Sequence, residues 1–181
     1  MKKNIIGAIV GGLIIFFWQF LSFTVLNLHD DANTYTPNQD SVLQYLADHL
    51  KEGQYFLPKA APGASSEEIQ KATSNGTPWA VIAFHTSYDS KMGMAISRSL
   101  ATDIVMIFLL CWVLSKINKA RFGTIFIACL CVGLIVFFNV PYTTHIFYQT
   151  FDMMAYFYDA LISFGLCGLW LGWWLPQKRK Y

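Results

Sequence analysis

Four long apolar stretches dominate the pattern of hydrophobic and polar positions along the chain. The first covers residues 4–27, carries no charged side chain and would span roughly 30 to 35 Å as a helix. The others cover residues 100–114, 122–140 and 153–175. Asp103 interrupts the second, which reaches the length of a membrane span only if its helix begins near Met94. The pattern therefore predicts four transmembrane helices.

The segment between the first two apolar stretches is mostly polar and too long for a plain loop. Residues 41–52 predict a helix with Asp40 as its N-cap. The apolar side chains of this helix share one face: Val42, Leu43, Leu46 and Leu50. Residues 55–57 and 79–84 predict short strands, and residues 67–74 predict a polar helix behind a serine cap. We expect these elements to form a small α/β unit.

Together these elements predict an all-α membrane protein. It is a four-transmembrane-helix bundle with a small α/β extracytoplasmic cap between the first and second transmembrane helices. Residues 1–28 form the N-terminal anchor helix and residues 29–93 the cap. Residues 94–181 form a three-helix transmembrane region that ends in a basic, cytoplasmic C-terminus.

The distribution of charge predicts the orientation, because basic residues near the ends of spans stay in the cytoplasm. Residues 29–98 hold five basic and eight acidic side chains. The remaining basic residues all fall at the opposite ends of the predicted spans: Lys2, Lys3, Lys116, Lys119, Arg121, Lys178, Arg179 and Lys180. We therefore expect both termini in the cytoplasm and residues 29–93 outside.

Composition supports a membrane protein and limits its partners. Hydrophobic residues make up 55% of the chain and charged residues 13%, against about 25% charged in soluble domains. The aromatic content of 17% argues against disorder. The net charge of +2 leaves no basic stripe for nucleic acid. The lipid bilayer is one expected partner, and other membrane subunits or further copies of the chain are another.

Catalytic and cofactor motifs are missing from the sequence. It contains no haem-attachment, zinc-protease, nucleophile-elbow, phosphate-loop or dinucleotide-binding motif. All four cysteines lie in the apolar stretches, where packing is their expected role. No two of the four histidines have helical metal-ligand spacing, which favours solvated or hydrogen-bonded surface histidines. No catalytic residue, metal site or cofactor is predicted.

Polar side chains within the apolar stretches are the candidate site, because a charge inside a bilayer costs at least about 2.5 to 3.5 kcal/mol. Counted from the cytoplasmic helix ends, four of them fall in the outer half of the membrane: Gln19, Asp103, Asn139 and Asp159. We expect a polar pocket that opens outward, with Arg98, His145 and Asp152 at its rim. Such a pocket could hold a lipid headgroup, a cation or a proton-relay water.

A structural interpretation of the same residues stays open. In it, Asp103 is neutralised by Arg98 or protonated, Asp159 lies at the interface, and the two amides join neighbouring helices.

Small residues indicate close helix approach in the first and fourth spans, at Gly7, Gly11, Gly12, Gly165, Gly168 and Gly172. The partner helix belongs either to this chain, which the sequence favours, or to another subunit.

The opening Lys2-Lys3 followed by Gly7-x3-Gly11-Gly12-x3-Phe16-Phe17-Trp18 resembles a group of uncharacterised bacterial inner-membrane proteins. Tyr55-Phe56-Leu57-Pro58 and Gly76-Thr77-Pro78 are similar to the same group. The resemblance implies a bacterial cytoplasmic membrane and an exported insert after the first of four spans, and it implies no activity.

The sequence thus favours an accessory or structural subunit of a larger membrane complex over an enzyme. The alternative is a binding or transport module for a lipid, quinone or cation that uses the outward-facing polar cluster.

Overall fold

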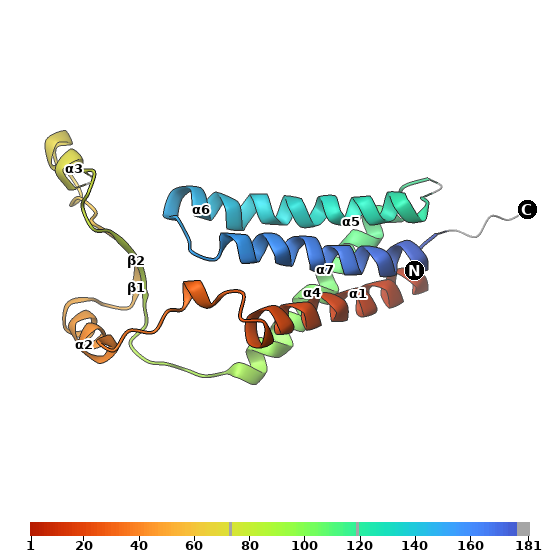
Figure 1. The fold of residues 1–181 in the computed structure, drawn as a ribbon, viewed down its shortest axis with the longest axis horizontal. Helices are drawn as coiled ribbons and strands as arrows, with labels where there is room; N and C mark the ends of the chain where they lie inside the picture. Colours follow the sequence, from red (N-terminus) through yellow and green to blue (C-terminus); the bar gives the residue numbers. More distant parts are fainter. Residues whose placement is uncertain (73, 119, 177–181) are drawn as a thin grey trace, which may run out of the picture. The chain divides into compact units, whose positions relative to one another are not determined.

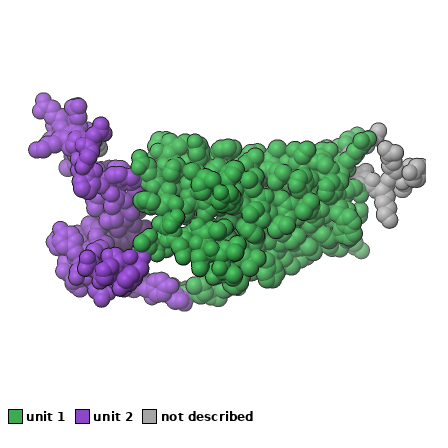
Figure 2. All heavy atoms as spheres, viewed as in Figure 1, with its two compact units in different colours: residues 1–34, 91–181 green, residues 35–90 purple. Residues whose placement is uncertain are grey.

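The computed structural model describes residues 1–72, 74–118 and 120–176. The chain divides into two compact units, one of residues 1–34 with 91–181 and one of residues 35–90 (Figure 2). Four of the basic residues that predict the orientation lie outside the described residues: Lys119, Lys178, Arg179 and Lys180.

The first unit consists of four long apolar helices. These are α1 (Lys2–Phe20) with a π-helical turn at Leu21–Val25, α4 (Met92–Leu114), α5 (Phe122–Phe137) and α7 (Met153–Trp174). A second π-helical turn, Phe138–Tyr142, continues α5 into α6 (Thr143–Tyr148). The four resulting helical segments are long and apolar enough to cross a membrane: Lys2–Val25, Met92–Leu114, Phe122–Tyr148 and Met153–Trp174. The four predicted apolar helices are therefore confirmed.

The third helical segment is longer than the sequence predicted. The predicted stretch ends at residue 140, whereas a π-helical turn accommodates Pro141, which lacks an N–H, and the chain stays helical to Tyr148. Thr143 Oγ1 donates to the carbonyl oxygen of Phe138 at 2.7 Å within this turn. The helix ends where Gln149 adopts a left-handed conformation with φ of 46°.

In the first unit α7 packs beside both α5 and α1, and α4 packs against α1, which it crosses at an angle (Figure 1). Two glycines explain the closest approaches. A Cβ on Gly12 would lie 2.8 Å from the Cα of Ile104 on α4, and a Cβ on Gly133 would lie 2.7 Å from the carbonyl oxygen of Ala160 on α7. Any larger residue at either position would push two backbones apart.

Most of the glycines singled out in the sequence lie at contacts within the chain. A Cβ on Gly7 or Gly11 would meet side chains of both α4 and α7, and one on Gly168 or Gly172 would meet α5. Gly165 differs, because its Cβ would make only an ordinary 3.7 Å contact with Leu130.

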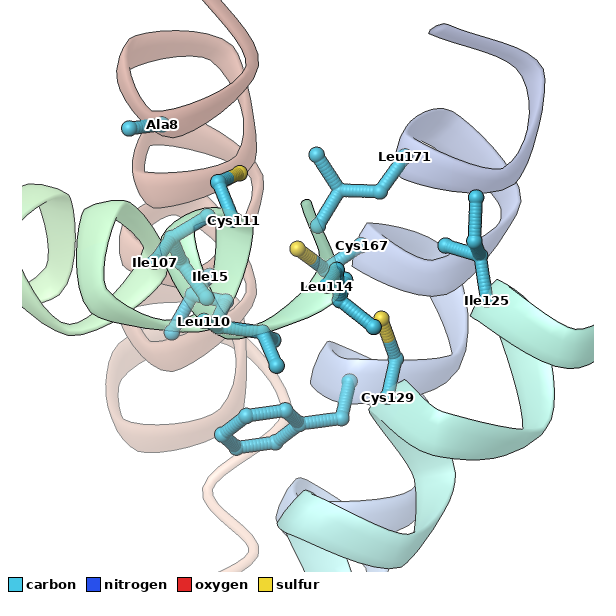
Figure 3. Close-up of a cluster of buried hydrophobic side chains, with 11 residues drawn as sticks. Ala8, Ile15, Ile107, Leu110, Cys111, Leu114, Ile125, Cys129, Cys167 and Leu171 are labelled. Carbon is cyan, nitrogen blue, oxygen red and sulfur yellow. The ribbon is translucent and has the colours of Figure 1, made fainter. Parts of the chain in front are cut away.

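The apolar core of the first unit joins all four helices (Figure 3). Its buried members are Ala8, Ile15, Ile107, Leu110, Cys111, Leu114, Ile125, Cys129, Phe164, Cys167 and Leu171. Its three cysteines are unpaired packing residues, while Cys131 is free and exposed. At one end of the core, the indole nitrogen of Trp174 donates to the carbonyl oxygen of Lys3 at 2.8 Å. That bond ties the end of α7 to the start of α1.

The second unit is built from α2 (Gln39–His49), β1 (Gly53–Leu57), α3 (Ser66–Ala72) and β2 (Ala80–Phe84). The two strands pair antiparallel, with Gly53 opposite Phe84 and Leu57 opposite Ala80, which confirms the predicted α/β character. Helix α2 begins at Gln39 behind Asn38, so the prediction of Asp40 as its N-cap is wrong and Asp40 lies in the first turn.

The start of α3 has reciprocal capping bonds. The backbone N–H of Ser65 donates to Glu68 Oε2 at 2.8 Å, and the backbone N–H of Glu68 donates to Ser65 Oγ at 3.3 Å. These bonds and the hydroxyl of Ser65 hold the pKa of Glu68 below its ordinary value.

Candidate functional site

The structure places the predicted polar residues of the first unit in two hydrogen-bonded groups and leaves Asn139 outside both. One group joins α1 to α4, where Gln19 Nε2 donates to Asp103 Oδ1 at 3.5 Å. Asp103 is 4% exposed, and its Oδ2 has no partner in the described part of the chain. None of the ion pairs found among the described residues includes this carboxyl group.

The second group is centred on His29, which the sequence did not single out. His29 Nδ1 lies 2.9 Å from Asp152 Oδ2, and His29 Nε2 lies 2.9 Å from Asp159 Oδ2. The indole nitrogen of Trp18 donates to the other oxygen of Asp159 at 2.9 Å. These four residues are named the His29 network.

Burial makes this network unusual. His29 is 3% exposed, and Asp152 and Asp159 are each 9% exposed. The imidazole stacks on Phe23 with ring centroids 3.8 Å apart, and Tyr156 meets it edge-on at 4.6 Å. Water therefore has little access to the two His–Asp bonds, and their electrostatic strength is correspondingly greater than at a surface.

The backbone after α1 explains why His29 returns to the helices. The chain leaves the π-helical turn with Asn27 in a left-handed conformation, φ of 51°. The backbone N–H of Leu28 donates to the carbonyl oxygen of Ser22 at 3.0 Å. This reversal brings the next side chain, His29, against α7.

On α7, the partners of His29 lie on one helical face. Asp152 is the N-cap of the helix, and Tyr156 and Asp159 follow four and seven residues later. A carboxylate at a helix N-terminus is also favoured by the helix dipole. The face continues to Ser163, whose hydroxyl donates to the carbonyl oxygen of Asp159.

The two His–Asp hydrogen bonds need one proton more than a neutral imidazole and two ionised carboxylates contain. A neutral imidazole has one N–H donor, whereas an ionised carboxylate only accepts. Two hydrogen bonds from His29 to two carboxyl groups therefore need either an imidazolium between two carboxylates or a neutral imidazole with one protonated carboxyl.

The predicted rim residues separate in the structure. Asp152 is buried in the His29 network rather than at a solvent-facing rim. His145 is partly buried, and its Nδ1 lies 2.9 Å from the carbonyl oxygen of Thr150. Arg98 is exposed on α4, and no ion pair between it and Asp103 occurs in the parts of the chain that are described. Asn139 is exposed in the π-helical turn after α5.

No group of three His, Cys, Asp or Glu side chains suited to a metal ion occurs among residues 1–72, 74–118 and 120–176. Comparisons of the chain with protein-family models, curated proteins and solved structures found no match.

Proposed function

We propose that the chain is a membrane protein that binds a proton and that the His29 network is the proton-binding site. The observation that supports the proposal is a 3% exposed imidazole with both ring nitrogens 2.9 Å from carboxyl oxygens. Histidine changes its charge nearest to physiological pH, and membrane-embedded chains of His, Asp and Glu are typical of proton relays.

Protonation of the network would also change the strength of the contact between the end of α1 and the start of α7. His29 follows α1, whereas Asp152 and Asp159 belong to α7. Loss of the shared proton would leave two buried carboxyl groups with too few donors, which is unfavourable in an apolar surrounding. The contact between the end of α1 and the start of α7 is then weaker in the deprotonated state. We propose that this coupling lets the module act as a cation-dependent binding or transport protein.

The proposed setting is a bacterial inner membrane with both termini in the cytoplasm and residues 29–93 outside. It rests on the basic residues at one end of the helices, such as Lys2, Lys3 and Lys116, and on the acidic excess of residues 29–98. In this orientation the His29 network lies at the outer ends of α1 and α7.

An accessory subunit remains a second candidate, although the glycine-rich faces no longer support it because most of them pack inside the chain. A different observation favours it: helix α2 leaves Val42, Leu43 and Tyr45 exposed. Purification from the native membrane in mild detergent, followed by mass spectrometry, tests this candidate. A stoichiometric partner protein would support it, and a lone chain or homo-oligomer would refute it.

Proton uptake by the purified full-length chain tests the first candidate. The protein in non-ionic detergent is titrated through the acidic and neutral range, and bound protons are counted per chain. We expect His29→Gln to bind about one proton fewer than the wild type. His49→Gln also removes one imidazole, which bonds the carbonyl oxygen of Tyr45 on the surface of α2, and it therefore gives the pH range over which the loss of an exposed histidine appears.

The infrared carboxyl band distinguishes the network from a lone histidine. In the wild type, we expect the band to respond to pH in a way that Asp152→Asn and Asp159→Asn each remove. Identical proton titrations for the wild type and His29→Gln, with the carboxyl band unaffected by either aspartate change, would refute the proton site.

A further inference from the structure

A groove lies between the end of α1 and the start of α4. Its volume is about 310 Å³. The apolar part of its lining comes from Phe16, Phe20, Phe23, Ala95 and Ile96. The polar part comes from Gln19 and Ser99. Because both walls belong to helical segments long and apolar enough to cross a membrane, a ligand for this groove comes from the bilayer.

Two buried polar atoms without described partners belong to residues that lie one helical turn from the polar lining of this groove. Asp103 Oδ2 and Ser22 Oγ are the buried side-chain atoms that lack a hydrogen bond within the described residues. Ser22 follows Gln19 by three residues, and Asp103 follows Ser99 by four, so each shares a helical face with a polar lining residue. Gln19 itself connects the groove to the carboxyl group through its bond to Asp103 Oδ1.

The carboxyl group of Asp103 also has no cationic partner among the described residues. Asp103 is 4% exposed, and its one described donor is a neutral amide at 3.5 Å. Ion pairing elsewhere in the first unit involves His29 and the aspartates of α7. A buried carboxylate is stable only when a cation or several good donors accompany it. A group that donates hydrogen bonds and carries positive charge would satisfy an ionised Asp103.

We propose that the groove binds an amphiphile with a primary ammonium head, taken from the membrane, and that Asp103 is the counter-ion of the ammonium group. The apolar chain of the ligand lies along the three phenylalanines and Ile96. The ammonium group displaces the long Gln19 bond and has three N–H donors for three acceptors, namely Asp103 Oδ2, Ser22 Oγ and the amide oxygen of Gln19.

The aromatic lining fits the same ligand. Phe16, Phe20 and Phe23 follow one another along α1 and its π-helical turn, and the faces of aromatic rings attract ammonium groups. An uncharged lipid chain would use the rings but would leave the carboxyl group of Asp103 unsatisfied. None of the three residues that hold the ammonium group belongs to the His29 network, although Phe23 in the groove stacks on His29.

Binding of three probe compounds to the full-length chain tests the proposal. The compounds are dodecylamine, which is protonated at neutral pH, dodecanol, which has the same chain without charge, and ethanolamine, which has the ammonium group without the chain. Native mass spectrometry counts the bound molecules, and calorimetry gives Kd. We expect one dodecylamine per chain, with dodecanol bound about tenfold or more weakly and ethanolamine not saturably bound.

Two variants examine the two ends of the ligand. Asp103→Asn removes the counter-ion, and we expect its Kd for dodecylamine to rise about tenfold or more. Asp48→Asn makes the same chemical change on the exposed surface of α2 and should leave the Kd unchanged. Ala95→Phe fills the groove from an exposed position, keeps Asp103 and should block binding of dodecylamine even if Asp103→Asn fails to fold.

Equal affinity for dodecylamine and dodecanol would overturn the proposal, because the groove would then recognise only an apolar chain. Unchanged dodecylamine binding in Asp103→Asn or Ala95→Phe would overturn it as well, and so would ethanolamine binding as tight as that of dodecylamine. If any of these results occurred with normal proton uptake, the ammonium site would be refuted and the proton site would stand.

Discussion

Replacement of His29 by glutamine should strongly destabilise the helices of the first unit. The change removes one member of a buried group, leaving Asp159 with Trp18 as its described side-chain donor and Asp152 with none. His29 makes two bonds of 2.9 Å to these carboxyl groups and a stacked contact with Phe23 at 3.8 Å. Bonds to charged groups contribute about 1.5 to 3 kcal/mol each, and breaking a buried pair costs about 3 to 5 kcal/mol. We expect a loss of about 3 to 5 kcal/mol.

Reversible unfolding in mixed micelles of a mild detergent and sodium dodecyl sulfate, followed by tryptophan fluorescence, measures the free energy of unfolding. His49→Gln is a matched control, because His49 also has a bond of 2.8 Å to the carbonyl oxygen of Tyr45 and a stacked ring contact, but on an exposed helix. Its effect should stay within about 0.5 kcal/mol.

A double-mutant cycle separates the network from a general packing defect. His29→Gln combined with Asp159→Asn removes one of the carboxylates that would be left unpaired, so the double variant should be more stable than the sum of the two single losses predicts. The expected coupling energy is about 0.5 to 3 kcal/mol. A loss below about 1 kcal/mol for His29→Gln, or strict additivity in the cycle, would refute the argument that His29 and Asp159 form a coupled buried pair.

Three further predictions follow from the described geometry. Gly133→Ala should destabilise the first unit by about 1 to 2 kcal/mol, because its Cβ would lie 2.7 Å from the carbonyl oxygen of Ala160, whereas Gly165→Ala, with a nearest contact of 3.7 Å, should be neutral or stabilising. The same micelle unfolding measures both, and equal stabilities would contradict the close approach of α5 and α7. Ser65→Ala should raise the pKa of Glu68 toward its ordinary value, because one of the two bonds from Ser65 that lower this pKa is lost. Because the folded-state pKa of Glu68 is depressed, the bond stabilises α3 above the ordinary pKa of glutamate, and this stabilisation is lost as the pH falls through the depressed value. A carboxyl NMR titration that finds equal pKa values for Glu68 in both proteins would refute the cap. Reporter fusions after Lys71 and after residue 119 should report opposite sides of the membrane, and reporters on one side would exclude four spans.

The helices and strands could be predicted because their signals are local. Long apolar runs, one of them interrupted by Asp103, define the four long helices, and the short apolar runs 55–57 and 79–84 predicted the two strands. The prediction differed from the structure at the start of α2 and at the end of the third long helix. Asn38 rather than Asp40 precedes α2, and a π-helical turn carries the third helix past Pro141.

The candidate site could be predicted only in part, since hydropathy gives the depth of a residue but not the helix that it faces. Asp103 and Asp159 have similar depths, yet one bonds to Gln19 and the other to His29 and Trp18. His29 lies beyond the apolar run, and only the reversal at Asn27 returns it to α7. Asp152, Tyr156 and Asp159 share one helical face, and this spacing was the sequence signal that could have indicated a polar side chain bound between them.

Helix α1 is synthesised before the helices that it contacts, which affects how the protein assembles. Helix α1 leaves the ribosome first, but it packs between α4 and α7, and the carboxyl groups that satisfy His29 are on the last of these helices. Until α7 enters the membrane, the imidazole and the indole of Trp18 have no acceptors from that helix. The bonds that hold His29 and Trp18 therefore form only after the whole intervening chain has been made, and a chain that lacked α7 would leave both side chains without these acceptors.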